Sequence, residues 1–270
     1  MQYDPIKKRL GAFFNRSPSL RILFYSLLNL LLLRAWHIKK ELKKYRKENT
    51  GSIRVLDAGS GFGQYTYYMM KLSKSWNITG IDLKTEQIRD CNDFINKINR
   101  EHQVNFKVAD LTTINEQDTY NLILCVDVME HIENDLQVFR NFVKALKPGG
   151  VVLISTPSDQ GGSDVHDNDS ESFIEEHVRD GYNIVEIEEK LRSAGFMKII
   201  SKYSYGKPGK VSWRISMKYP IIMLSRSKLF YIILPFYYIL TFPFTLLFNF
   251  LDVNIKHKSG TGLIVKAGIN

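Results

Sequence analysis

The residues best suited to binding a ligand lie in one short stretch, residues 55–64. An apolar run at 53–56 predicts a buried strand that ends at Asp57, and three glycines follow at alternate positions: Gly59, Gly61 and Gly63. Glycine lacks a side chain, so a ligand can come close to the backbone N–H groups of such a turn. A helix is predicted directly after it, and a helix N-terminus attracts polar and anionic groups. The stretch therefore predicts a binding site for a polar small molecule.

Two further acidic residues, Asp82 and Asp110, follow the next two predicted strands, at 77–81 and 104–108. The carboxyl ends of parallel strands meet at one edge of a doubly wound sheet, where ligands bind. Asp82 comes twenty-three residues after Gly59, where a carboxylate can accept both hydroxyls of a ribose. Asp110 can accept from an exocyclic amine. Either acid alone would more often be a helix cap, but with the glycines they predict a site for a nucleoside-containing cofactor.

The glycine spacing helps to identify that cofactor. Dinucleotide-binding turns follow the pattern G-x-G-x-x-G, whereas the third glycine here comes one residue early, which disfavours an NAD-dependent oxidoreductase. The sequence resembles the class I S-adenosylmethionine-dependent methyltransferases in VLDAGSGFG (55–63), TGIDL (79–83), VADL (108–111), YNLILCVDVMEHI (120–132) and LKPGGVVLISTP (146–157). The motifs cover about residues 49–204. Glu130-His131 and LKPGG are most similar to the branch that contains the ubiquinone-biosynthesis O-methyltransferases.

The resemblance implies S-adenosyl-L-methionine (SAM) as the cofactor and gives each matching position a role. Asp57, Gly59 and Gly61 would line the methionine part of SAM. Gly63 belongs to the same predicted cofactor-binding set. The first strand and its turn are thus expected to bind the amino-acid end of the cofactor.

The remaining predicted contacts come from the next three strand ends. Asp82 would bind the ribose, and Leu83 beside it completes this part of the set. Asp110, with the backbone N–H of Leu111, would bind the adenine. Val126, at the end of the fourth strand, would lie beside the sulfonium, where the methyl group leaves.

Methyl transfer from a sulfonium is an in-line displacement, so the protein mainly aligns the acceptor with the methyl group and excludes water. An oxygen or nitrogen acceptor can need a base. The candidates are His131, after the fourth strand, and His177, before the helix that follows the fifth. The alternatives are a structural hydrogen bond for His131 and a capping or loop contact for His177. The acids around His166 lack the glycine and terminal glutamate of a calcium loop, so no metal is predicted.

Strands and helices alternate along the motif region, which predicts an α/β fold with helices on both faces of a parallel sheet. The resemblance implies a Rossmann-like, doubly wound sheet of seven strands whose last strand, near 262–267, is antiparallel. The chain divides into a basic amphipathic N-terminal helical segment, a SAM-binding core, an apolar and basic insertion, and the final strand: residues 1–48, 49–204, 205–258 and 259–270.

The basic surplus lies outside the core. The net charge is +9 for residues 1–48, −9 for 49–201 and +8 for 202–258, and both basic flanks are rich in apolar residues. This combination predicts contact with an anionic membrane surface and no nucleic-acid partner. The alternative is a solvated basic face. The only two cysteines, Cys91 and Cys125, favour a reducing, cytoplasmic compartment.

Residues 229–251 carry no charge and are long enough to span a bilayer. Pro235 and Pro243 are expected to break this run into short pieces, and the final strand must return to the same sheet. A monotopic, hairpin-like insertion is therefore favoured over a true span or an apolar lid buried on the core. Residues 18–47 are expected to form one helix that lies in the interface or covers the core, with Arg21 and Arg34 flanking its uncharged part.

The sequence thus predicts a SAM-dependent methyltransferase, peripheral or monotopic on the inner face of a membrane. Its expected substrate is a lipid-like or otherwise apolar small molecule, methylated at oxygen rather than at nitrogen or carbon. Two other functions remain open. One is a soluble methyltransferase whose insertion forms a lid over an apolar substrate, and the other is a non-catalytic SAM-binding membrane scaffold.

Overall fold

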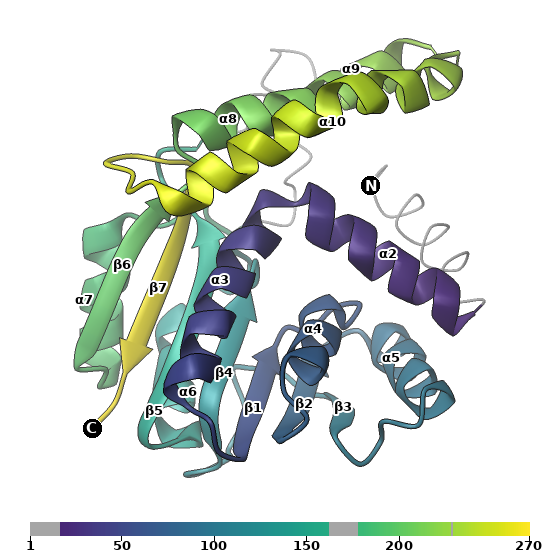
Figure 1. Cartoon of the computed structure of the whole chain (residues 1–270). Coiled ribbons are helices and arrows are strands. Elements are labelled where there is room, and N and C mark those ends of the chain that lie inside the picture. The colour runs from purple at the N-terminus through teal and green to yellow at the C-terminus, as the bar shows by residue number, and fades with distance from the viewer. Residues whose placement is uncertain (1–16, 162–177, 228) are drawn as a thin grey trace.

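A mixed sheet of seven strands forms the centre of the computed structural model, which describes residues 17–161, 178–227 and 229–270 (Figure 1). The strands are β1 (Ile53–Ala58), β2 (Trp76–Asp82), β3 (Val104–Val108), β4 (Tyr120–Val126), β5 (Leu146–Pro157), β6 (Lys198–Ser204) and β7 (Gly262–Gly268). Their order in the sheet is β3-β2-β1-β4-β5-β7-β6. β7 is antiparallel to both of its neighbours, and the other pairs are parallel. The predicted fold, with its antiparallel last strand, is confirmed.

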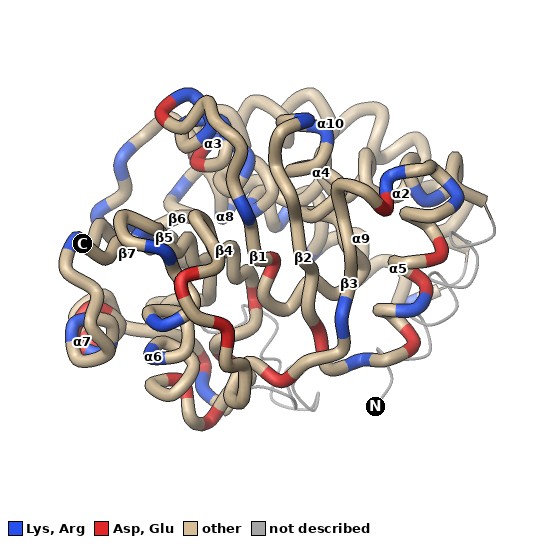
Figure 2. Tube along the Cα trace, turned by 90° about the horizontal axis from the view of Figure 1, so that it is seen from below, with Lys and Arg blue, Asp and Glu red and all other residues tan. Residues whose placement is uncertain are grey.

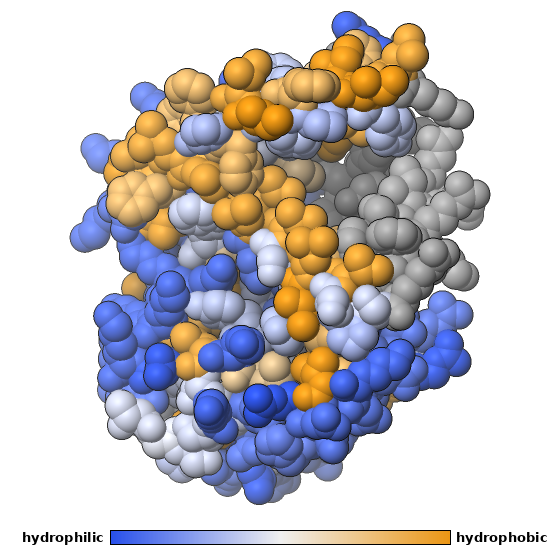
Figure 3. Space-filling view, turned by 45° about the vertical axis from the view of Figure 1, so that its right-hand side comes forward, coloured by the Kyte–Doolittle hydropathy of each residue, from blue (hydrophilic) through white to orange (hydrophobic). Residues whose placement is uncertain are grey.

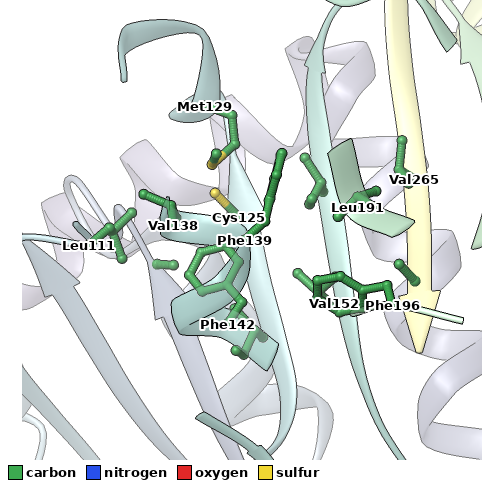
Figure 4. Close-up of a cluster of buried hydrophobic side chains, with 14 of the residues drawn as sticks. Leu111, Cys125, Met129, Val138, Phe139, Phe142, Val152, Leu191, Phe196 and Val265 are labelled. Atoms are coloured by element: carbon green, nitrogen blue, oxygen red, sulfur yellow. The ribbon is translucent and has the colours of Figure 1, made fainter. Parts of the chain in front are cut away.

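Helices cover both faces of the sheet (Figure 1). One face carries α3 (Leu33–Glu48), α4 (Gln64–Leu72) and α5 (Thr85–Lys97), and the other carries α6 (Asp135–Ala145) and α7 (Ile184–Ala194). A hydrophobic core lies on each face of the sheet: the first under α3, α4 and α5, and the second under α6 and α7. In β4, Leu122 and Leu124 belong to the first core, whereas Ile123 and Cys125 belong to the second. Successive strand side chains point to opposite faces, so this unbroken apolar run suits a strand buried on both sides. Figure 4 shows the second core, to which α6 contributes Phe139.

The N-terminal segment is bent, so the prediction of a single helix over 18–47 is wrong. α2 (Pro18–Leu31) and α3 meet at an angle of 94°. Leu32, between them, has an extended backbone with φ −85° and ψ 113°. α2 packs over α4 and α5 through Arg21 and Tyr25, whereas α3 packs on the sheet through Ile38 and Leu42. A straight helix could not make both sets of contacts.

The insertion folds as a helical hairpin, residues 207–254, that extends beyond the sheet (Figure 1). One arm consists of α8 (Lys207–Trp213), a π-helical turn (Arg214–Lys218) and α9 (Tyr219–Arg226), and the other is α10 (Phe230–Asn254). The predicted breaks at Pro235 and Pro243 are wrong, because α10 is continuous across both. Between them, the hydroxyls of Tyr237 and Tyr238 donate to two carbonyls of the π-helical turn, at 2.7 and 2.9 Å. These bonds hold α10 against the other arm where the prolines remove its own N–H donors.

Candidate active site

The glycine-rich turn joins β1 to α4 at the carboxyl edge of the sheet. Gly59, Gly61 and Gly63 all have positive φ, at +76°, +50° and +77°. The N–H of Gly59 donates to the carbonyl of Ile81 at 2.9 Å, which ties the turn to β2. A Cβ on Gly59 would lie 2.2 Å from the side chain of Val128, whereas nothing lies within 4 Å of a Cβ on Gly61. The turn therefore packs tightly at Gly59 and is open at Gly61, where a ligand can reach the backbone.

Asp82, the last residue of β2, lies against this turn. Its carboxylate accepts from the N–H of Gly61 at 2.9 Å and from the N–H of Lys84 at 3.0 Å. A carboxylate can accept about four hydrogen bonds, so two ribose hydroxyls could still be accommodated. Leu83, the next residue, is 66 % exposed. The structure brings Asp82 and the glycines together, and their role in cofactor binding stays a prediction.

Asp57 is a buried acid beneath the turn. Its side chain accepts from the hydroxyl of Thr66 in α4 at 2.5 Å, and the residue is only 2 % exposed. Burial raises the pKa of Asp57 to about 6, although the hydrogen bonds from Thr66 act in the opposite direction. The charge of Asp82 adds to the rise. A cation bound nearby would stabilise the ionised form of Asp57.

Asp110 lies next to Asp82 at the edge of the sheet, because the N–H of Ala109 donates to the carbonyl of Asp82 at 3.2 Å. The Asp110 carboxylate accepts from both the N–H and the hydroxyl of Thr112, each at 2.8 Å. Asp110 therefore stabilises a turn rather than capping a helix, and its carboxylate keeps further acceptor capacity. Leu111 is buried in the core.

The end of β4 carries a cluster that the sequence analysis missed. Val126 is followed by Asp127, which has a positive φ of +52° and forms an ion pair with Arg34 of α3. The N–H of Arg34 also donates to the hydroxyl of Tyr205 at 3.0 Å. The hydroxyl of Tyr65, which lies within the electrostatic influence of Arg34, is buried without a hydrogen-bond partner among the described residues. These contacts join distant parts of the chain, and no local motif signals them.

Arg21 of α2 holds the glycine-rich turn from outside. Its guanidinium donates to the carbonyl of Phe62 at 3.0 Å, to the carbonyl of Asp90 at 2.7 Å and to the hydroxyl of Tyr25 at 2.7 Å. Tyr25 donates to the same Phe62 carbonyl. Arg21 is 3 % exposed. Arg21 is therefore a buried structural residue on the side of α2 that covers the core.

The predicted pair Glu130-His131 divides between the interior and the surface. Glu130 is 1 % exposed and accepts from the hydroxyl of Thr156 at 3.1 Å, and burial raises its pKa. His131 ends a short 3-10 helix (Met129–His131) and is exposed, so its role as a base stays a prediction. His177 and His166 lie outside the described residues. Within the described part of the chain, no cluster of three or more His, Cys, Asp or Glu side chains could hold a metal ion.

The residues at this edge fit the chemical groups of SAM. SAM has ribose hydroxyls, an adenine amine and a positively charged methionine end. Asp82 and Asp110 provide acceptors for the first two, and the acid of Asp57 suits the positive charge. Gly61 leaves open space against its backbone, and the hydroxyl of Tyr65 has no hydrogen-bond partner within residues 17–161, 178–227 and 229–270.

Comparison with known proteins agrees with this geometry. A family model described as a methyltransferase domain matches residues 30–200. The chain belongs to this methyltransferase family. It is 32 % identical to a phosphoethanolamine N-methyltransferase of Triticum aestivum over 150 residues, 55 % of this chain and 29 % of that protein. It is 25 % identical to a ubiquinone biosynthesis O-methyltransferase of Rickettsia akari over 124 residues, 46 % of this chain and 48 % of the other.

The chain thus spans less than a third of the wheat enzyme and about half of the rickettsial one. Among solved structures it is similar to the [4+2]-cyclase SpnF, with a TM-score of 0.58 and 15 % identity over 87 % of this chain and 82 % of the other. A Haemonchus contortus phosphoethanolamine N-methyltransferase 2 in complex with SAM gives a TM-score of 0.55 and 21 % identity over 81 % and 49 %. At these identities the structures show a shared fold. The predicted family, fold and cofactor, SAM, are confirmed.

Proposed function

We propose that the protein transfers a methyl group from SAM to a lipid-like or otherwise apolar small molecule at an anionic membrane surface. The observation that carries the membrane part is the exposure of α10. This helix is long and apolar enough to cross a bilayer. Yet only 6 % of the residues in its most apolar 18-residue stretch are buried within the protein. Ile232, Ile239 and Leu240 are each about 70 % exposed. A large exposed apolar surface of this kind marks a contact site for a partner or a membrane.

The polarity of the hairpin supports lipid as that partner. Apart from Pro220, the buried side chains of the hairpin are polar: Ser212, Ser216, Thr245, Asn249 and Asp252. The hydroxyl of Ser212 donates to Asn249 at 2.5 Å. Polar groups thus pair inside while apolar groups face outward, which is favourable in lipid and unfavourable in water. A lid packed on the core would show the reverse arrangement.

The hairpin is anchored to the core at its base. Asp252, near the end of α10, is fully buried and accepts from His37 of α3 at 2.8 Å and from the N–H of Gly209 at 2.9 Å. The chain therefore enters the hairpin through α8 and leaves it through α10 at the same end. β7 then returns to the sheet, which supports a monotopic insertion over a single crossing. The basic flanks suit the anionic inner face of a membrane.

The chemistry at the site would be an in-line displacement at the methyl group that SAM supplies. The described residues would bind SAM at the carboxyl edge of β1 and β2 and admit the acceptor beside Val126. We propose oxygen as the acceptor atom, in line with the ubiquinone-biosynthesis relatives, and His131 or His177 as the base. Because the wheat relative is by name an N-methyltransferase, nitrogen is the second candidate.

Two measurements on one preparation test this proposal. Flotation with vesicles of phosphatidylcholine and phosphatidylglycerol should carry the chain to the lipid fraction, and methyl-labelled SAM should transfer label to the organic phase of a cell lipid extract. Asp82→Asn should still float but lose the transfer. A chain that remains with soluble protein would contradict the membrane part. Tight binding of S-adenosylhomocysteine without any methyl transfer would favour the scaffold instead.

A further inference from the structure

We propose that the hairpin lies in the plane of the membrane and that α2 docks beside it, so that one face of the protein contacts the bilayer. This inference rests on the proposed membrane function and adds which surface docks and how it is oriented. The docking face consists of the exposed apolar side chains of α2 and α10, represented by Leu23, Leu27, Leu30, Ile232, Leu240 and Phe250. The occupant is a fluid anionic bilayer.

The apolar side of α10 runs along its whole length. Ile232, near the start, is 69 % exposed, Ile239, in the middle, is 71 % exposed, and Phe250, near the end, is 57 % exposed. At 3.6 residues per turn these three lie within about 20° of one another around the helix axis. From Ile232 to Phe250 the helix rises about 27 Å at 1.5 Å per residue. In Figure 2 the trace of α10 is tan over most of its length, in keeping with Asp252 as its single charged residue. The apolar surface is therefore a stripe parallel to the helix axis, as in helices that lie in an interface.

The other arm of the hairpin is charged along its length. Lys207, Lys210 and Arg214 are exposed at spacings of three and four residues, whereas Ser212 and Ser216 are buried against α10. If the hairpin crossed the bilayer, these successive turns would carry their charges into the hydrocarbon, where charged side chains are costly. If the hairpin lies flat, the charges stay at one depth, where they can reach lipid phosphates.

α2 completes the same face. Leu23, Leu27 and Leu30 are 50 %, 40 % and 37 % exposed and recur at helical spacing, whereas Arg21 and Tyr25 on the opposite side are buried. Figure 3 shows apolar side chains of the hairpin and of α2 together on one side of the molecule, above a hydrophilic lower half. The 94° bend after α2 turns this helix away from the direction of α3. One plane can therefore touch both segments, and two separated contacts fix the orientation of the protein.

The docking face also lies next to the site. The bend that ends α2 leads directly into Arg34, the second residue of α3, whose side chain pairs with Asp127 at the end of β4. An acceptor dissolved in the bilayer would therefore meet the carboxyl edge of the sheet close to Val126, without passing through water. This short path is what a methyltransferase acting on an apolar acceptor requires.

Depth-dependent fluorescence quenching tests this orientation. Tryptophan is introduced separately as Ile232→Trp, Ile239→Trp and Phe250→Trp, and Leu27→Trp reports on α2. The full chain is bound to phosphatidylcholine–phosphatidylglycerol vesicles whose acyl chains carry bromine near the head group, in the middle or at the end. The tryptophan fluorescence of the unsubstituted chain, measured on the same vesicles, is subtracted. All four positions should lie at one shallow depth, about 5–10 Å below the head groups.

Ile200→Trp, on the exposed edge strand β6, is the matched control, since Ile200 is 67 % exposed and lies outside the docking face. It should show no quenching. A gradient that deepens from Phe250 to Ile232 would overturn the flat orientation, and so would a floating chain in which none of the four positions is quenched. Failure to float would instead contradict the proposed function on which this inference rests. S-adenosylhomocysteine binding confirms that each variant is folded.

Discussion

Asp57 is a buried acid whose protonation depends on what lies beside it. Because burial raises its pKa to about 6, the carboxyl is protonated below that pH when no cation is near. SAM brings positive charge, which favours the ionised form, so binding SAM should release a proton below pH 6. We therefore expect the affinity for SAM to rise with pH and to be about tenfold weaker at pH 5 than at pH 7. Calorimetry between pH 5 and pH 7 measures this affinity.

The control for this prediction is Asp57→Asn, in which no proton can be released. Its affinity for SAM should be lower at neutral pH and should lose most of the dependence between pH 5 and pH 7. An equally steep dependence in the variant would show that another group titrates.

Gly61 provides a second test at the scale of a single residue. Gly61→Ala places a Cβ in open space at a φ of +50°, which costs about 1 kcal/mol of stability. If SAM occupies that space, its affinity should fall at least about tenfold, a loss of about 1.4 kcal/mol. Gly51→Ala is the matched control, because nothing lies within 4 Å of its added Cβ and its φ is not positive. Unchanged affinity in Gly61→Ala would place the cofactor elsewhere.

The sequence was sufficient to predict the position of residues that directly follow a strand. The glycines, Asp82 and Asp110 stand next to strand ends, so alternation of strands and helices was enough to bring them to one edge. The pairing of Arg34 with Asp127 could not be predicted, because it depends on the angle between α2 and α3 and on the left-handed backbone of Asp127. Neither leaves a pattern in the sequence.

At the scale of elements, α2 is the part of the N-terminal segment that supports the cofactor turn. Arg21→Met would leave the carbonyls of Phe62 and Asp90 without this donor in a buried site. The Phe62 carbonyl keeps the hydrogen bond from Tyr25, so the loss is that of hydrogen bonds from a buried charged donor, worth about 1.5–3 kcal/mol each. Because Met also avoids burying a charge, the free energy of unfolding should fall by about 2–4 kcal/mol, as measured by denaturant titration. The affinity for SAM should fall as well, because Phe62 belongs to the turn.

Arg46→Met, an equivalent change at an exposed position of α3, should alter neither the stability nor the affinity for SAM. If Arg21→Met kept the parent affinity for SAM while losing stability, α2 would support the fold without positioning the turn.

The two mispredicted elements have the same physical origin. The break at Leu32 and the continuity of α10 across Pro235 and Pro243 both oppose local propensity. Tertiary contacts decide them, through Arg21 and Tyr25 in α2 and through the tyrosine hydroxyls between the prolines in α10. Local patterns locate such helices but do not determine where they bend.

At the scale of the whole molecule, the docking face should control membrane affinity independently of cofactor binding. Burial of a Leu or Ile side chain is worth about 1.5–3 kcal/mol, so Ile239→Ser with Leu240→Ser should lower partitioning into anionic vesicles by at least about tenfold. Both positions are exposed, at 71 % and 72 %, so the affinity for SAM should stay the same. Co-sedimentation with vesicles measures the change. Ile200→Ser, equally exposed on β6, should partition like the parent chain.

Composition alone predicted apolar and basic flanks but could not say which side of each helix would be buried. The structure shows that the buried side chains of the hairpin are polar apart from Pro220, and that the exposed stripe along α10 is apolar. We use that arrangement to propose a lipid-facing surface rather than a lid over the core, and it depends on how the two arms pack against each other.

The closeness of the docking face to the carboxyl edge of β4 has a kinetic consequence. An acceptor that reaches the site from the bilayer is not diluted by the volume of the solution, so its effective concentration is its mole fraction among the lipids. We expect the reaction rate to fall when inert phospholipid is added at constant total acceptor, a surface dilution that an enzyme fed from water would not show. The protein would then respond to the composition of its membrane rather than to the amount of substrate in the cell.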